Sequence, residues 1–112
     1  MDLSSTVSGH YTIITVNAPR IDSAAAIQFK DAMRAATQDA AGTIVLDLGH
    51  VEFIDSSGLG AVVASMKQLS GGQRLDLAAL KPDVAKVFRL TRMDSIFQIH
   101  ENLDALPHAK AG

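Results

Sequence analysis

The apolar run at residues 43–48 is the feature that most limits how this chain can fold. Its sequence, Thr-Ile-Val-Leu-Asp-Leu, is almost continuously hydrophobic, which is typical of a central strand that is largely covered. Segments with apolar residues at helical spacing lie before and after it. Because helices that alternate with strands join them in parallel, this arrangement predicts an α/β fold.

The N-terminal part of the chain predicts a hairpin followed by a helix. The segments Leu3–Ser8 and Tyr11–Val16 flank a Gly-His turn, which favours two antiparallel strands. Asp22 or Ser23 can cap the helix that follows. An apolar stripe at helical spacing predicts the buried face of this helix: Ala26, Phe29, Met33, Ala36 and Ala40.

The rest of the chain continues the alternation. A short apolar segment at 51–54 precedes a helix whose apolar residues lie between positions 59 and 69. A strand at 74–80, a third helix after Pro82, a short strand at 95–100 and the start of a terminal helix at 102–106 follow. We therefore expect a mixed four- to five-stranded sheet packed against helices, in a single domain over residues 1–112.

The composition disfavours several classes of function. The 112 residues include no cysteine, which removes disulfides, thiol catalysis and cysteine-based metal sites. Ten Lys and Arg against 12 Asp and Glu give a net charge of −2, whereas a general nucleic-acid binder is clearly basic. The first residues lack the pattern of a targeting segment, and no stretch reaches the roughly 18 apolar residues that cross a bilayer. We expect a cytoplasmic protein without membrane insertion.

Familiar catalytic motifs are absent from the sequence. A Gly-Leu-Gly turn at 58–60 precedes a predicted helix, but Val63 stands where the dinucleotide fingerprint needs Gly or Ala. The Gly-Gly pair at 71–72 lacks the Lys-Ser/Thr ending of a phosphate-binding loop. Neither Ser56 nor Ser57 has the flanking glycines of a nucleophile elbow. These observations disfavour an enzyme or a nucleotide binder.

Metal and acid–base sites are also disfavoured. The four histidines show no helical i, i+4 pair and no HExxH motif, so we expect no metal and no cofactor. Several carboxylates could gather in space and share a proton for acid–base chemistry, although helix capping and solvation explain them more simply. These carboxylates are Asp22, Asp47, Glu52 and Asp55.

The segment at 51–60, Val-Glu-Phe-Ile-Asp-Ser-Ser-Gly-Leu-Gly, is harder to explain by packing alone. An apolar run leads to one Asp and two hydroxyls, and two glycines then fall in the first turns of a helix. A helical Gly costs about 1 kcal/mol relative to Ala, so the pair suggests that another backbone or another molecule comes close. The alternative is an Asp or Ser cap whose glycines ease a tight turn.

A serine at this helix start is a candidate for regulation by phosphorylation. The free N–H groups and the positive end of the helix dipole tolerate a phosphate there. Phosphorylation adds about −1.5 to −2 charges at neutral pH. Beside Asp22 and Asp55, that charge could repel an acidic partner, and like charges at an interface cost on the order of several kcal/mol. Binding could therefore switch without refolding.

The segment at 46–60 resembles the signature of STAS-domain anti-sigma-factor antagonists, most specifically at Asp-Ser-Ser-Gly-Leu-Gly. The resemblance extends over nearly the whole chain. It includes the acidic Asp22 before the first helix, the Gly-Gly turn before a strand, and the helix end at 87–93 followed by a strand at 97–99. It implies the STAS fold and a small bacterial switch protein without catalysis of its own.

The resemblance also implies a mechanism. In this family the unphosphorylated form binds an anti-sigma factor that is also a GHKL-type serine kinase, and so frees the sigma factor. The kinase inactivates the antagonist by phosphorylating a serine, and a PP2C-type phosphatase reverses the step. The phosphorylated position maps onto Ser56 and the neighbouring hydroxyl onto Ser57, while Asp22 and Asp55 map onto acids beside the site.

One position departs from the family pattern, because Arg20 stands where a Glu often precedes the first helix. We expect Arg20 to pair with Asp55 or with a phosphate on Ser56, and the charge reversal to bear on which partner is chosen.

The expected partner surface runs from the start of the second helix to the turn before the first. Its predicted partner-binding residues are Asp22, Ser23, Asp55, Ser57, Gly58, Leu59 and Gly60. Leu59 is expected to be an exposed apolar contact between two glycines; the alternative is a core position in the stripe with Val62 and Met66. A constitutive STAS subunit of a larger assembly, such as a lipid transporter, is the competing function.

Overall fold

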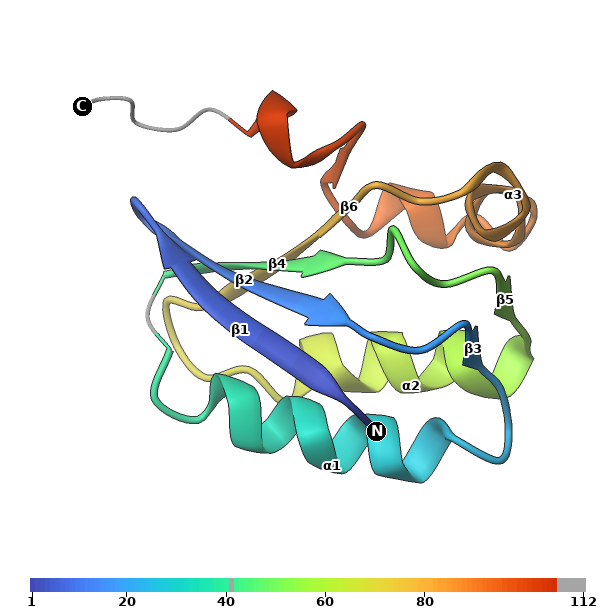
Figure 1. Ribbon diagram of the computed structural model, residues 1–112, viewed down its shortest axis with the longest axis horizontal. Helices are drawn as coiled ribbons and strands as arrows, with labels where there is room; N and C mark the ends of the chain where they lie inside the picture. Colours follow the sequence, from blue (N-terminus) through green and yellow to red (C-terminus); the bar gives the residue numbers. More distant parts are fainter. Residues whose placement is uncertain (41, 107–112) are drawn as a thin grey trace.

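The computed structural model describes residues 1–40 and 42–106, and its main feature is a five-stranded sheet covered by helices (Figure 1). The sheet has the order β1-β2-β4-β6-β7. Its strands are β1 (Leu3–Ser8), β2 (Tyr11–Val16), β4 (Thr43–Asp47), β6 (Arg74–Ala78) and β7 (Ile99–His100). The helices are α1 (Ala26–Thr37), α2 (Ser56–Lys67) and α3 (Pro82–Leu90), with 3-10 turns η1 (Met93–Ser95) and η2 (Leu103–Ala105).

The sheet is mixed, as predicted. Strands β1 and β2 form an antiparallel hairpin in which Leu3 lies opposite Val16 and Ser8 opposite Tyr11. From β2 onward every neighbouring pair, β2–β4, β4–β6 and β6–β7, is parallel. The antiparallel hairpin and the parallel crossovers confirm the predicted α/β class and a sheet of five strands.

The hydrophobic core lies between the sheet and the helices α1 and α2, which run side by side beneath it (Figure 1). Ile44 and Leu46 of β4 are fully buried there, which confirms the prediction of a covered central strand. Phe29 and Met33 of α1 are buried as their stripe predicts. Val45 faces the other side of the sheet, where a smaller cluster with Ala78 and Leu106 covers it.

Several element boundaries differ from the predictions. Helix α1 ends at Thr37, so Ala40 packs against the core from beyond the helix. The strand expected at 95–100 is only two residues long, and its expected first residue, Ser95, belongs to the 3-10 turn η1 that follows the left-handed Arg92. The expected terminal helix is the short turn η2, in which the Asn102 side chain accepts a hydrogen bond from the Ala105 amide.

A second, two-stranded sheet lies at the end of the molecule where α1 and α2 begin, and the sequence did not predict it. Strands β3 (Arg20–Ile21) and β5 (Phe53–Ile54) pair in parallel, with Ile21 opposite Ile54. The Pro19 carbonyl extends the pairing by accepting hydrogen bonds from the amides of Glu52 and Phe53. This small sheet brings the segment before α1 against the segment before α2.

Candidate partner-binding site

Asp55 joins the two segments that the small sheet brings together. Its Oδ1 accepts a hydrogen bond from the Gly58 amide at 2.9 Å, which caps the start of α2. Its Oδ2 accepts a second hydrogen bond, from the Ser23 amide at 3.1 Å in the turn before α1. An Asp or Ser helix cap was the alternative explanation of the segment at 51–60, and Asp55 is that cap. The same carboxylate also fixes the turn at Ser23.

Asp22 stabilises that turn from the other side. Its Oδ1 accepts a hydrogen bond from the Ala25 amide at 3.2 Å, and its Oδ2 pairs with the Arg20 Nε at 3.2 Å. The hydrogen bond from the Arg20 guanidinium lowers the pKa of the Asp22 carboxyl. The Asp22 carboxyl therefore stays ionised at pH values below the usual pKa of an aspartate. It lies in the turn beside the exposed Ser23.

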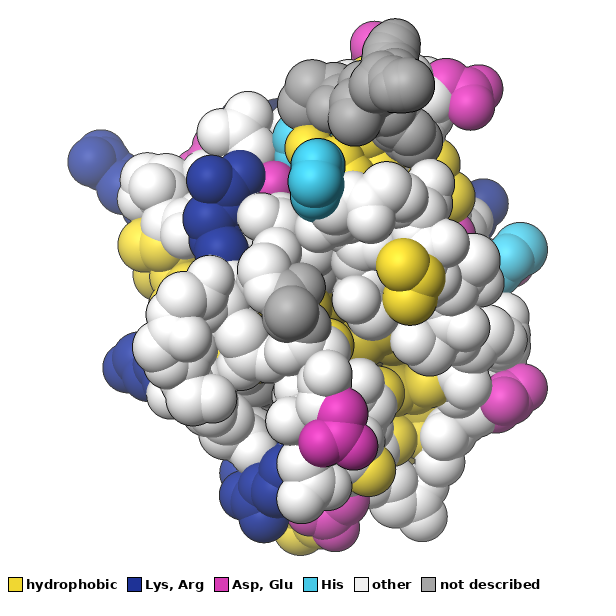
Figure 2. All heavy atoms as spheres, turned by 90° about the vertical axis from the view of Figure 1, so that its left-hand side faces the viewer, with side chains coloured by type: hydrophobic (Ala, Val, Ile, Leu, Met, Phe, Trp, Pro, Cys, Tyr) yellow, Lys and Arg dark blue, Asp and Glu magenta, His cyan; other side chains and the backbone are white. Residues whose placement is uncertain are grey.

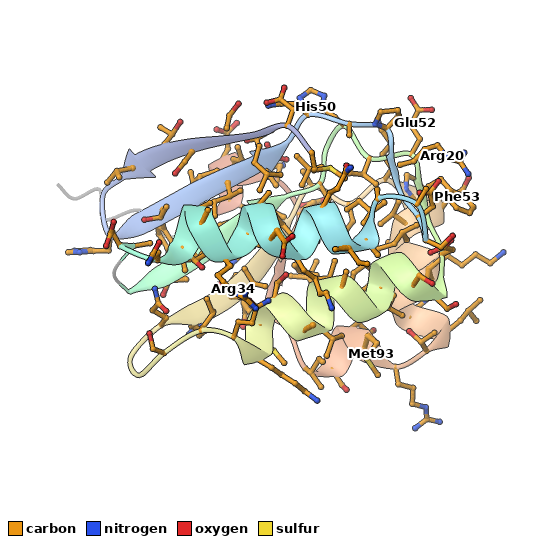
Figure 3. All side chains as sticks on the ribbon, turned by 90° about the horizontal axis from the view of Figure 1, so that it is seen from below. Arg20, Arg34, His50, Glu52, Phe53 and Met93 are labelled. Atoms are coloured by element: carbon orange, nitrogen blue, oxygen red, sulfur yellow. The ribbon has the colours of Figure 1, made fainter. Side chains whose placement is uncertain are left out.

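Arg20 does not pair with Asp55, and that part of the expectation is wrong. The guanidinium lies over the Phe53 ring with its central carbon 4.2 Å from the ring centroid, because Arg20 and Phe53 are opposite residues in the β3–β5 pair. The Arg20 Nε pairs with Asp22 instead, and the two carboxylate oxygens of Asp55 bind backbone amides. Figure 3 shows Arg20 and Phe53 together at this end of the molecule.

Ser56 and Ser57 are exposed and occupy the first two positions of α2. The first amides of a helix have no partner within it, and here the Asp55 side chain takes the Gly58 amide. No hydrogen bond of either serine side chain is present among residues 1–40 and 42–106. The two hydroxyls are therefore open to another molecule, at the positive end of the helix dipole.

The two glycines of the segment have different roles. A Cβ at Gly58 would overlap the carbonyl oxygen of Ile21 and would lie 3.0 Å from a side-chain carbon of Ile54. Gly58 therefore allows the first turn of α2 to lie directly against β3, which is the close backbone approach suggested by its sequence position. A Cβ at Gly60 would have no neighbour within 4 Å, so packing within the described chain does not require this glycine.

Leu59 is buried, and the expectation of an exposed apolar contact there is wrong. Only 7% of the residue is accessible, and it belongs to the hydrophobic core together with Val62. The reason is the helical spacing, since positions 59 and 62 share the face of α2 that is turned to the sheet. Gly58 is also buried, so the exposed residues of the predicted surface are Ser23, Ser56, Ser57 and Gly60, while Asp22 and Asp55 are half-buried.

Two exposed hydrophobic residues at this end were not among the predicted site residues. Phe53 is 40% accessible, and Ile27, in the first turn of α1, is 69% accessible. The burial difference between the strand neighbours Phe53 and Ile54 follows the two-residue period of a strand, which was the available sequence signal. Figure 2 views the opposite end of the molecule, where hydrophobic side chains appear as separate small areas among other atoms.

The carboxylates proposed for acid–base chemistry do not form one cluster. Asp47 lies in β4, where its side chain accepts hydrogen bonds from the Thr15 hydroxyl and the Gly49 amide. Asp55 caps α2, so the capping interpretation holds for this residue. The expectation that Asp22 or Ser23 caps α1 is wrong: that helix has Ala25 as its N-cap with no side-chain cap hydrogen bond, and Asp22 binds the Ala25 amide in the turn before it. Within the described parts of the chain, no group of three or more His, Asp or Glu side chains could hold a metal ion.

Comparison with known proteins now gives the family. The model of the STAS domain matches residues 3–106. The chain belongs to the STAS domain family. It is 36% identical over 86 residues to BtrV of Bordetella bronchiseptica, a protein whose name assigns it to the anti-sigma factor antagonists; this match covers 76% of the present chain and 74% of BtrV.

Solved STAS structures show how widely the fold is shared. The anti-sigma factor antagonist SpoIIAA, known in an unphosphorylated form and in a phosphorylated form from Bacillus, is 24% identical over 94% of this chain, with TM-scores of 0.69 and 0.62 and 93% and 96% of its own chains covered. The murine anion transporter Slc26a9 is 19% identical over 93% of this chain and 18% of its own, with a TM-score of 0.77. Likeness at these identities shows the fold alone.

The function is therefore indicated by the sequence relative rather than by the fold. Similarity to a named anti-sigma factor antagonist supports a partner-switching role in general. In residues 1–40 and 42–106, no helix is both long enough and apolar enough to cross a membrane.

Proposed function

We propose that this STAS domain is a phosphorylation-controlled partner-switching protein. In its unphosphorylated form it binds an anti-sigma factor that is also a GHKL-type serine kinase, and phosphorylation of Ser56 releases that partner. A PP2C-type phosphatase restores the binding form. The chain itself performs no catalytic step in this cycle, which takes place in the cytoplasm.

The observation that carries the proposal is the setting of Ser56. Its side chain is exposed at the first position of α2, directly after Asp55, and the rigid parts around it are held by hydrogen bonds that do not involve its hydroxyl. A kinase can therefore reach the hydroxyl without unfolding α2. The accessible neighbours Ser57 and Gly60 leave little side-chain bulk around it.

The charge of a phosphate explains how modification would switch binding rather than folding. The α2 N-terminus favours an anion on Ser56, so phosphorylation does not greatly lower the folding stability of the domain. At a contact surface, the added charge of about −1.5 to −2 stands beside the carboxylates of Asp22 and Asp55. An acidic partner group near them then meets like charges, at a cost on the order of several kcal/mol. A loss of 4 kcal/mol would weaken binding about a thousandfold.

Two further observations support the proposal. SpoIIAA, a protein with the same fold, is known in a phosphorylated form. The segment at 55–60 of this chain also keeps the family motif intact, with a serine at the position that the resemblance assigns to phosphorylation. A constitutive STAS subunit of a larger assembly would not need that serine.

The deciding experiment uses two baits, Ser56→Ala and Ser56→Asp, in affinity capture from the lysate of the source cells. We expect mass spectrometry to find a GHKL-type kinase with the alanine bait and not with the aspartate bait. Ser57→Ala and Ser57→Asp are the matched controls, because Ser57 is the adjacent exposed hydroxyl. Retention of one and the same non-kinase partner by both Ser56 baits would contradict the proposal and favour the constitutive subunit.

A reconstitution then tests the covalent step. The captured kinase is incubated with ATP and the wild-type domain, and the modified position is located by peptide mass spectrometry. We expect a single phosphate on Ser56, its absence in Ser56→Ala, and its removal by a PP2C-type phosphatase. A phosphate on Ser57 alone would show that the residue assignment is wrong while the switch itself operates.

A further inference from the structure

The outer edge of β1 is a second surface at which the domain can make specific contacts. Strand β1 lies at the end of the sheet, and no other strand of the described residues pairs with its outer side. An edge of this kind presents a row of free backbone donors and acceptors, which are a template for pairing with another strand. The edge is separate from the site at Ser56, and the inference drawn from it does not depend on the proposed function.

The register of the hairpin shows which backbone groups point outward. The Asn17 amide donates a hydrogen bond to the Asp2 carbonyl at 2.9 Å, so this opposite pair is a hydrogen-bonded one. Such pairs alternate with non-bonded pairs along an antiparallel ladder. The amides and carbonyls of Leu3, Ser5 and Val7, at the odd positions of β1, therefore face away from β2.

Strand β1 lacks the usual features that keep a free edge unpaired. Natural sheets protect their edges with charged residues, proline, bulges or very short strands. The sequence of β1, Leu-Ser-Ser-Thr-Val-Ser, has no charged residue and no proline, and all six residues pair with β2 in one continuous register. Val7, near the end of the strand, is 75% accessible.

We propose that β1 pairs antiparallel with β1 of a second copy of this chain, with Ser5 opposite Ser5 across a two-fold axis. In this register the three outward-facing residues of one strand pair with those of the other. Leu3 lies opposite Val7 of the second copy, and Val7 lies opposite Leu3 of the second copy. Six backbone hydrogen bonds become available, and each exposed Val7 side chain is covered by a leucine. On the other face of the sheet, Ser4 lies opposite Thr6 of the second copy, a pairing of hydroxyls that suits cross-strand contacts.

The second copy fits this edge for two reasons. The outward positions match one another about Ser5, and the strand carries no charge that would repel its own copy. The assembly also closes at two copies. The other end of the five-stranded sheet is β7, which has only two residues and is followed by the turn η2, so no edge of comparable length remains for a third copy.

The test is the mass of the wild-type domain in solution, measured by sedimentation velocity from low micromolar to millimolar concentration. We expect a monomer–dimer equilibrium. Ser5→Lys puts two lysines opposite each other and should weaken the dimer at least several-fold, whereas Gln98→Lys, an equal charge change beside β7, should leave it unchanged. Mixing Ser5→Lys with Ser5→Glu should restore the dimer, because opposite charges then meet at the two-fold axis.

A disulfide test examines the register itself, since the natural chain has no cysteine. Opposite residues of a hydrogen-bonded pair have Cα atoms about 5.5 Å apart, within the range that a disulfide spans. We expect Ser5→Cys to form a covalent dimer at low concentration, and Thr6→Cys to do so far more slowly. A wild-type monomer at every concentration, a dimer unaffected by Ser5→Lys, equal cross-linking by both cysteine variants, or assemblies larger than two would each overturn the proposal.

Discussion

Replacing Gly58 with alanine tests the close approach of α2 to β3 that builds the candidate site. The added Cβ would overlap the Ile21 carbonyl oxygen and would press on Ile54 at 3.0 Å. The obstacle is a backbone atom of a paired strand rather than the flexible end of a side chain. The helix or β3 must therefore move, and the Asp55 hydrogen bonds to Gly58 and Ser23 move with them.

The magnitude follows from two opposing effects. Overpacking costs about 1–3 kcal/mol, and we take the upper end because the backbone cannot yield easily. Replacing a helical glycine by alanine returns about 1 kcal/mol. The free energy of unfolding should therefore fall by about 2 kcal/mol. Gly60→Ala is the matched control: a Cβ there meets nothing within 4 Å, so only the helix-propensity gain of up to about 1 kcal/mol remains.

Urea unfolding followed by circular dichroism measures both variants. The urea midpoint should be highest for Gly60→Ala, intermediate for the wild type and lowest for Gly58→Ala. The free energies of unfolding of the two variants should differ by about 3 kcal/mol. A urea midpoint for Gly58→Ala equal to or above that of the wild type would refute the close contact between α2 and the Ile21 carbonyl. A large loss in Gly60→Ala would refute the conclusion that this side of α2 is open.

Three further predictions concern the same end of the molecule. Asp55→Ala should lower the free energy of unfolding by about 1–2 kcal/mol, because it removes the α2 cap and the bond to the Ser23 amide; an unchanged urea midpoint would contradict this role. Leu59→Ala should cost about 2–4 kcal/mol, and a loss under 1 kcal/mol would contradict its burial. Arg20→Ala should raise the pKa of the Asp22 carboxyl toward its ordinary range, measured by NMR titration, because the Arg20 guanidinium lowers that pKa. The ion pair stabilises the folded wild type above the ordinary aspartate pKa, and this stabilisation is lost as the pH falls through the lowered pKa of Asp22. Arg20→Ala lacks the pair, so its free energy of unfolding should fall less than that of the wild type as the pH is lowered between these two pKa values.

The parts of the fold that depend on local pattern were predictable. The apolar run of β4, the hairpin turn between β1 and β2, and the stripe of Phe29 and Met33 on α1 all appear in the structure. Each depends on residues within a few positions of one another, so periodicity alone identifies it. The N-cap role of Asp55 was recognised for the same reason, as one of two interpretations of its segment.

The errors concern contacts between segments distant in the chain. The β3–β5 pair has two residues in each strand, too few for any periodic signal. Arg20 pairs with Asp22 and stacks on Phe53 because that sheet exists, and this removes it from Asp55. Leu59 lies in the core with Val62; the helical stripe offered this position as an alternative, and the packing of α2 against the sheet decided in its favour.

By itself, the sequence determined the class of fold, the start of a helix at the Asp-Ser-Ser-Gly segment, and the resemblance to the STAS family. Only the tertiary structure decided which of those residues another molecule can reach: Ser56, Ser57 and Gly60 are exposed, and Gly58 and Leu59 are buried. The physical reason is that periodicity selects the buried face of an isolated helix, whereas accessibility at its first turn depends on what packs there. Here the Ile21 carbonyl occupies one side of that turn and leaves the serines open on the other.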